Sequence, residues 1–436
     1  MNLKKHLLFV LAWSAVVIGC QPDADEIPPV VIVDTPVENQ SVQVPETLKV
    51  RAAISDEKAL CQVAVTLLDA NQIPVAAPIS QSVEGSRFNL EVDYPITDLY
   101  LESGTYYLRI SAFDGTNQGK ALVALALGGV PKMLQEVVVV TQTGTNQLAV
   151  EGYQSGVGFR SIAQYSSDYA GSGVSSRHQY MAVTGNKTGS FKVLEYPTGN
   201  LLWEVPILNA SFENFTNWGY FNDLSYVGLA DGRVHGYNFL GELDFASAIE
   251  QSWIPESFLL HEGLFLLEQR AVNGTDRRIS WYFDFSGAKE RDSKPILFDV
   301  VELFGHNANE VLLFCNENGE GVIKTLFQST SGISNARTLP NGTIQAVLQI
   351  KTDVYLIAHS TGVYEYRYGS STGLLSIIGG KNAQVLGYDS LGERLFLGIG
   401  NQLEEYFYVP GSGFASTLGT TLTGGTVLGV HPIYNK

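Results

Sequence analysis

"EVVVVTQTGTNQLAVEGYQSG", residues 136–156, has the pattern of two β-strands joined by a polar turn. Such a hairpin needs a further strand to pair with, because an isolated two-stranded hairpin is only marginally stable in water. No complete sheet precedes the hairpin in the sequence, and a long polar stretch follows it. The partner of this hairpin therefore decides the architecture of about two-thirds of the chain.

Strong apolar strands recur along the rest of the chain, with successive starts 39 to 47 residues apart. Each is followed by a polar turn and an alternating strand that ends near a glycine. A period near forty residues with four strands per unit indicates β-propeller blades and argues against a helical repeat. The seven strong strands are EVVVVT (136), QYMAVT (179), LSYVGL (224), GLFLLEQ (263), EVLLFC (310), DVYLIA (353) and RLFLGI (394).

The hairpin at 136 lacks the inner strand that should precede each strong strand, whereas the other six strong strands each have one. Residues 426–433, TVLGVHPI, closely match the inner strand QVLGYDSL at 384–391. We therefore expect a seven-bladed propeller over residues 131–436, whose last blade is closed by the C-terminal strand. Residues 136 to about 162 supply the other three strands of that blade. Closure removes the unpaired edges of an open sheet.

The inner strands also predict how the blades meet at the axis. We aligned the seven predicted inner strands with one another, taking SIAQYSS (161–167) as the first of them. Gln164 then falls at an aligned position that is rich in glycine, and Tyr165 falls at the position that follows. Glycine in this column permits close approach between converging blades. The next column contains His261 and His306 but also Ile and Val, and two histidines are too few for a zinc site. We expect packing between blades there and no bound metal.

Residues 30–130 have short alternating strands every ten to fifteen residues, which predicts an antiparallel β-sandwich. The stretch GTYYLRISAFDGTNQGK (104–120) resembles the last hairpin of bacterial Ig-like, PKD and cadherin-like modules. This resemblance implies an Ig-like domain that acts as a spacer. An acidic and proline-containing linker, residues 20–29, precedes it.

The N-terminus carries a targeting signal. Lys4 and Lys5 precede an apolar run that is too short to span a bilayer comfortably, which predicts a signal peptide over residues 1–19. The sequence VVIGC resembles a bacterial lipobox, which implies lipidation at Cys20 and a membrane anchor. The following QPDADE resembles the export signal of Bacteroidota-type surface lipoproteins, which implies display at the surface of the outer membrane.

The composition argues against a nucleic-acid partner and against a fold held together by disulfide bonds. The formal net charge of −17 argues against a nucleic-acid partner, since phosphate backbones are bound by clustered Lys and Arg. Three cysteines are too few for a disulfide framework. Cys61 and Cys315 lie in apolar strand-like runs, so both are predicted to be buried.

The propeller lacks the signature dipeptides of WD40 repeats, the sialidase Asp box and the double-glycine kelch motif. FKVLEYPTGNLLWEV (191–205) resembles a repeat unit of PQQ-like and YncE-like propellers. It occurs convincingly once, so no quinone or other cofactor is expected. In domain order the chain resembles the accessory lipoproteins of SusC/SusD-type nutrient uptake systems, an analogy at the level of the fold.

Function is the least determined property. No catalytic motif is present, and the carboxylates considered for a polysaccharide hydrolase or lyase (Asp223, Asp231, Asp284 and Glu310) lie in turns or at strand starts. Aromatic residues near the inner strands, Phe215, Trp218 and Trp253, are the candidate ligand-binding residues. We expect a non-catalytic binder of a glycan or an envelope protein. The alternatives are a hydrolase or lyase and a structural scaffold of an outer-membrane complex.

Overall fold

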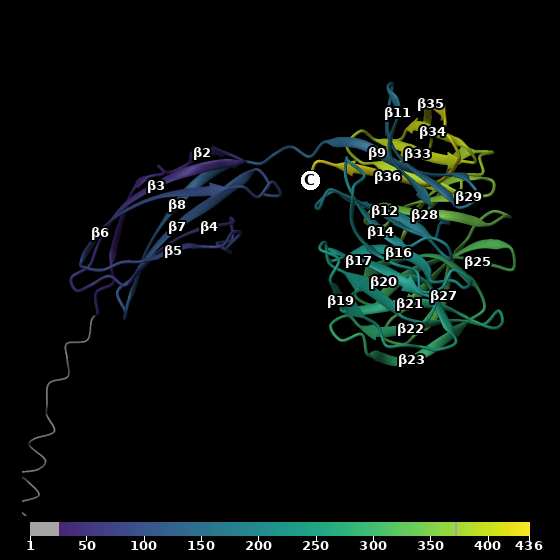
Figure 1. Cartoon of the computed structure of the whole chain (residues 1–436), viewed down its shortest axis with the longest axis horizontal. Helices are drawn as coiled ribbons and strands as arrows, with labels where there is room; N and C mark the ends of the chain where they lie inside the picture. The colour runs from purple at the N-terminus through teal and green to yellow at the C-terminus, as the bar shows by residue number, and fades with distance from the viewer. Residues whose placement is uncertain (1–25, 371–372) are drawn as a thin grey trace, which may run out of the picture. The chain divides into compact units, whose positions relative to one another are not determined.

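The computed structural model describes residues 26–370 and 373–436 (Figure 1). All the regular secondary structure in this part of the chain is β-strand. Among these residues there is no helix that is long and apolar enough to cross a membrane. The predicted all-β class is confirmed. The chain separates into two compact units, Met1–Pro131 and Lys132–Lys436.

The first unit has two sheets around one hydrophobic core. Burial alternates along β3 (Glu46–Ser55), so that Val50 of one sheet and Ile110 of the other belong to the same core. The strand orders are β1-β3-β6 and β2-β8-β7-β4-β5. The remaining bounds are β1 Val30–Thr35, β2 Gln40–Gln43, β4 Gln62–Leu68, β5 Ile79–Ser82, β6 Arg87–Ile96, β7 Gly104–Phe113 and β8 Gln118–Gly128.

The two described cysteines differ in burial. Cys315 is fully buried among apolar side chains of the second unit, as predicted. Cys61 is exposed, so its predicted burial is wrong. It lies just before β4, and its thiol donates to the carbonyl oxygen of Asp114 at 3.2 Å, which holds it at the sheet end and not inside the core. Both thiols are free.

The second unit is built from seven four-stranded sheets, six of which take four consecutive strands. Within each sheet every neighbouring pair is antiparallel, so the chain runs up and down before it passes to the next sheet. Their bounds are β12 Gly171–Ser175, β13 Tyr180–Thr184, β14 Phe191–Glu195, β15 Leu201–Val205; β16 Phe215–Phe221, β17 Leu224–Leu229, β18 Val234–Tyr237, β19 Leu243–Ala246; β20 Trp253–His261, β21 Leu264–Ala271, β22 Arg277–Phe283, β23 Lys289–Ile296; β24 Asp299–Asn307, β25 Glu310–Glu317, β26 Glu320–Phe327, β27 Gly332–Thr338; β28 Ile344–Lys351, β29 Val354–His359, β30 Gly362–Arg367, β31 Leu374–Gly379; β32 Val385–Asp389, β33 Arg394–Ile399, β34 Gln402–Phe407 and β35 Ser416–Leu422.

The seventh sheet joins the two ends of the unit. The C-terminal strand β36 (Thr426–Tyr434) pairs antiparallel with β9 (Leu134–Gly144), with Val430 opposite Val139. β10 (Gln147–Gln154) and β11 (Gly158–Ser166) complete the order β11-β10-β9-β36. The predicted pairing of the hairpin at 136 with the last strand is therefore confirmed, and the two strands lie side by side in Figure 1.

The first strands of the sheets form a closed ring. β12 contacts β16, and the contacts continue through β20, β24, β28 and β32 to β36, which in turn contacts β12. Hydrophobic clusters fill the space between neighbouring sheets; one of them combines Leu266 and Trp281 with Leu313 of the next sheet. This closed arrangement of four-stranded sheets is a β-propeller.

One sequence assignment in the ring is wrong. Residues 161–167 were expected to be an inner strand, but β11 is the outermost strand of the joined sheet, where Gln147 lies opposite Ser166. The inner strand is β12, so Gln164 and Tyr165 do not belong to the axial columns. A Cβ atom on Gly173 of β12 would lie 2.0 Å from the Trp218 ring, so the close approach expected of the inner strands occurs at this glycine.

Truncation tests the closure. A chain that ends at Gly425 loses β36, including the buried side chains of Val427, Val430 and Ile433. Removing these side chains costs more than about 5 kcal/mol, which is comparable to the whole stability of a domain. We expect the second unit to lose its cooperative thermal transition in calorimetry.

A point variant provides the matched control for that truncation. Tyr434→Phe removes only a hydroxyl that donates to Asp389 Oδ1 at 2.9 Å, and it should cost about 1 to 2 kcal/mol with cooperativity retained. A truncated chain that melts like the intact one contradicts the closure.

Candidate functional site

The antiparallel order of each sheet places three features on one face of the propeller. These are the start of the first strand, the link between the second and third strands, and the end of the fourth strand. We call this the upper face, and the opposite one the lower face. Residues 206–214 precede β16 and residues 247–252 precede β20, so both loops selected from the sequence lie on the upper face.

The aromatic side chains of the first loop separate into one exposed and one buried ring. Phe212 is 67% exposed. Phe215 is only 2% exposed and packs in a hydrophobic cluster with Tyr180 and Val227. Phe215, a candidate ligand-binding residue, therefore offers no open ring face, because the chain enters β16 at this residue and turns the ring into the space between sheets.

The rings of the two candidate tryptophans, Trp218 and Trp253, are each in contact with neighbouring residues. The Trp218 ring covers Gly173 on the neighbouring inner strand and stacks on Tyr220 with 6.5 Å between ring centroids. Its indole Nε1 is buried and has no hydrogen-bond partner in the described chain. The Arg278 guanidinium lies 4.0 Å from the centroid of the Trp253 ring, a cation–π contact that covers one side of that ring.

An apolar pocket of about 390 Å³ opens beside the first loop. Leu208, which is 91% exposed, and Phe212 belong to its wall, together with the buried Phe215. His235 also lines the pocket; burial lowers its pKa, and its Nδ1 lies 3.1 Å from the hydroxyl of Tyr237. The pocket wall therefore combines apolar side chains with the imidazole of His235, and Glu213, Asp231 and Arg233 also line it.

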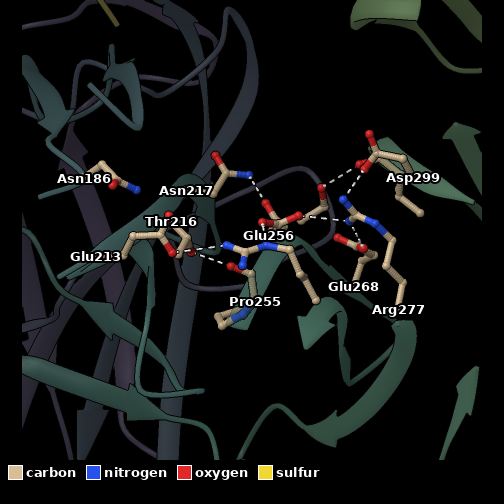
Figure 2. Close-up of polar contacts among 12 residues, drawn as sticks. Asn186, Glu213, Thr216, Asn217, Pro255, Glu256, Glu268, Arg277 and Asp299 are labelled. Carbon is tan, nitrogen blue, oxygen red and sulfur yellow. Dashed lines mark hydrogen bonds and ion pairs between the residues drawn. The ribbon is translucent and has the colours of Figure 1, made fainter. Parts of the chain in front are cut away.

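An ion-pair network lies at the upper ends of three neighbouring sheets (Figure 2). The Arg277 guanidinium contacts Glu256 at 2.9 Å and Asp299 at 2.8 Å, and it also pairs with Glu268. Asn217 at the mouth of the axial channel donates to the Glu256 carbonyl oxygen at 2.9 Å. The network thus ties together the starts of the first strands β16, β20 and β24.

A second arginine extends this network to the pocket. Arg270 pairs with Glu256 and, at 3.1 Å, with Glu213, which lines the apolar pocket. Glu268 is fully buried, and burial raises its pKa to about 7 against the opposing effect of Arg277. Arg270 is paired with two carboxylates and Arg277 with three, so the network stabilises the upper face and neutralises both guanidinium groups.

The axial channel forms a cavity of about 930 Å³ lined by all seven first strands. Part of its wall is a chain of hydrogen bonds between β36 and β12. The Tyr169 hydroxyl donates to the Leu428 carbonyl oxygen at 3.0 Å and lies 2.8 Å from Ser172 Oγ, which lies 2.8 Å from His431 Nε2. The tyrosine proton goes to the carbonyl, so Ser172 donates to Tyr169 and accepts from His431.

The direction of these hydrogen bonds shows whether His431 can act as a general base for Ser172. The serine proton is directed away from the imidazole, so His431 is not placed as a base for Ser172. Burial lowers the pKa of His431 to about 4, which keeps the ring neutral near pH 7. The pair joins the last strand of the chain to the first complete sheet.

Glu302 of β24 is the one carboxylate among the residues that line the cavity, and no Lys or Arg lines it. Its Oε1 accepts from the backbone N–H of Leu303 at 3.2 Å, and among the described residues it forms no ion pair. Burial raises its pKa to about 7. The amino-acid sequence does not identify this residue as a candidate, because a single glutamate in a strand carries no signal of what it faces.

The carboxylates considered for catalysis are dispersed. Asp223 lies at the lower face, 2.6 Å from Arg177, and Asp231 lies on the upper face beside Arg233, at the other end of β17. The carboxylates that do converge, those of Glu256, Glu268 and Asp299, are each paired with Arg277. The described residues contain no group of three potential metal ligands. The predicted lipidation residue, Cys20, lies outside the described residues.

Glu302→Gln tests the environment of the channel carboxyl. The folded-state pKa lies above the unfolded value, so wild-type stability should fall as pH rises from about 4.5 to 7. The variant should match the wild type at pH 4 and be more stable by about 1 to 3 kcal/mol at pH 8 in urea unfolding. The exposed Glu320→Gln, with the same loss of charge, should show no such trend. Equal stabilities of Glu302→Gln and wild type at pH 8 would count against a buried carboxyl.

Comparisons with known proteins find similar structures but no similar sequences. No family model and no curated protein matches the sequence. A quinoprotein alcohol dehydrogenase-like protein from Bacteroides thetaiotaomicron has 11% identity and a TM-score of 0.49, over 94% of this chain and 99% of its own. BamB from Moraxella catarrhalis has 12% identity and a TM-score of 0.40, over 69% and 93%. The WD40 propeller domain of Doa1 has 11% identity and a TM-score of 0.43, over 62% and 92%. At these values no activity, ligand or partner is transferred, and the fold assignment rests on strand pairing.

Proposed function

We propose that this chain is a lipid-anchored protein of the bacterial cell envelope that binds a partner protein without catalysis. In this proposal, residues 1–19 are a signal peptide and 20–29 a linker, residues 30–130 form an Ig-like spacer, and residues 131–436 form a seven-bladed propeller. Two sheets around one core support the Ig-like assignment, and seven four-stranded sheets in a closed ring support the blade number.

The apolar pocket on the upper face carries the proposal of a protein partner. Leu208 and Phe212 are 91% and 67% exposed beside this pocket, and solvent contact with such side chains is unfavourable unless a partner covers them. The ion pairs of Asp231 with Arg233 and of Glu213 with Arg270 lie at its edge. An apolar centre with a charged rim is the usual composition of a protein interface. The occupant we propose is an apolar side chain of an envelope protein.

A glycan is the weaker ligand for this face. Sugar rings stack on open aromatic faces and need hydrogen-bonding groups beside them. The Trp218 ring lies on Gly173, and Arg278 covers one side of Trp253. Phe212 is the one exposed aromatic ring of the pocket wall, and the exposed side chain of Leu208 in the same wall is aliphatic and offers no hydrogen bond to a sugar hydroxyl. A role as a scaffold in an outer-membrane uptake complex is the form of protein binding that the domain order supports.

The anchor can be tested at Cys20. A Cys20→Ala protein should lose labelling by an alkyne-tagged fatty acid and appear in the soluble fraction, because its only acyl attachment site is removed. Replacing Asp23, Asp25 and Glu26 by alanine should keep the label but abolish cleavage by protease added to intact cells. Membrane retention of unlabelled Cys20→Ala would exclude the anchor, and unchanged surface cleavage would exclude the acidic export signal.

The pocket can be tested by capture from crosslinked, intact membranes. We expect wild type to retain one stable protein and the double variant Leu208→Asp, Phe212→Asp to lose it by at least tenfold, about 1.4 kcal/mol or more, because a charge replaces each apolar anchor. Both residues are exposed, so folding is preserved. Phe285→Asp, 82% exposed on the lower face, is the matched control. A partner retained equally by all three proteins, or glycan binding that the double variant keeps, overturns the proposal.

A further inference from the structure

The axial cavity has an unusual balance of charge. Its wall takes residues from all seven first strands, and Glu302 is the one Asp, Glu, Lys or Arg among them. The two histidines of the wall each have a hydrogen-bond partner, the Asn307 carbonyl oxygen for His261 and Ser172 for His431. A cavity of about 930 Å³ thus contains one carboxyl group and no cation of the described protein to neutralise it.

Most other polar groups of the wall are satisfied by the protein. The Tyr388 hydroxyl donates to the Tyr408 carbonyl oxygen at 3.2 Å, and the Tyr220 hydroxyl donates to Asp223 at 3.1 Å. Gln349 donates to the Tyr355 hydroxyl. Glu302 differs, because its Oε1 accepts only from its neighbour Leu303 and its Oε2 has no partner among the described residues. Glu302 is half-buried in the channel wall, and a carboxylate that faces no cation of the described protein favours a cationic ligand over an anionic one.

Aromatic residues of three neighbouring first strands line the same channel as Glu302. Phe304 lies two residues after Glu302 on β24, and Phe258 lies on the adjacent first strand β20, which contacts β24. Phe221, Tyr220 and Trp218 continue the aromatic wall along β16. Ring faces attract ammonium groups, and the attraction increases where water is excluded. A channel lined by a single carboxylate and several aromatic residues therefore matches an organic cation better than a metal ion, which needs several oxygen or nitrogen ligands.

We infer that the axial channel binds a small organic cation, with its ammonium group at the Glu302 carboxylate and its apolar part against the aromatic wall. The site is separate from the apolar pocket on the upper face and does not depend on a protein partner. Binding keeps Glu302 ionised, so the ligand stabilises the propeller and its affinity falls when the carboxyl is protonated.

The test compares two probes of the same shape and different charge. We expect choline to bind wild type in isothermal titration calorimetry and 3,3-dimethylbutan-1-ol, its neutral isostere, to bind at least tenfold more weakly. Glu302→Gln should lose at least tenfold in choline affinity and gain nothing for the isostere. This substitution removes a destabilising charge, so the variant should fold. Glu320→Gln, an exposed carboxyl on β26, should bind choline like wild type.

A second measurement locates the probe. Trp218 lines the same cavity, so its indole N–H signal should shift when choline is added to nitrogen-labelled protein, and Trp218→Phe assigns that signal among the five tryptophans. Binding that is lost in Glu302→Gln together with this shift supports the site. Absence of choline binding, equal binding by Glu302→Gln, or a shift confined to other tryptophans overturns it. Partner capture through Leu208 and Phe212 is unaffected by any of these results.

Discussion

The pairing of β36 with β9 is the constraint on which the rest of the second unit depends. Hydrogen bonds between these strands join the two ends of about three hundred residues into one sheet. Each sheet packs on its neighbours, so an opening at any one place would expose two apolar faces at once. The pairing is reinforced at the C-terminus, where Gln179 donates to the Tyr434 carbonyl oxygen at 2.7 Å and the Tyr434 backbone N–H donates to Ser176 at 3.0 Å.

Closure of the ring also determines which side chains line the axial cavity. The first strands converge, so several side chains there must lie on a glycine of the next strand, as Trp218 lies on Gly173 and His261 on Gly305. These contacts leave a cavity whose polar wall is largely satisfied by the protein, apart from the indole Nε1 of Trp218 and one carboxylate oxygen of Glu302. A half-buried carboxylate that faces no cation of the described protein attracts a positively charged ligand. This residue is therefore the natural centre of a ligand site.

The upper face combines a rigid part with an exposed apolar part. The ion pairs around Arg277 and Arg270 fix the positions at which β16, β20 and β24 begin. Beside them, the loop that contains Leu208 and Phe212 exposes the apolar side chains for which we propose a protein partner. A rigid support beside an exposed apolar loop reduces the ordering cost of binding, which is what a non-catalytic binder requires.

The sequence alone determined the all-β class, the repeated strands and the partner of the hairpin at 136, because alternation and periodicity are local patterns that repeat along the chain. It did not distinguish β11 from β12, since both segments have strand patterns and only pairing with β10 decides between them. Phe212 and Phe215 belong to one short stretch, yet one ring is exposed and the other is buried. The convergence of three carboxylates on Arg277 and the isolation of Glu302 were decided by tertiary structure alone. Such contacts join residues of different sheets, and no local pattern records which side chains meet across the space between them.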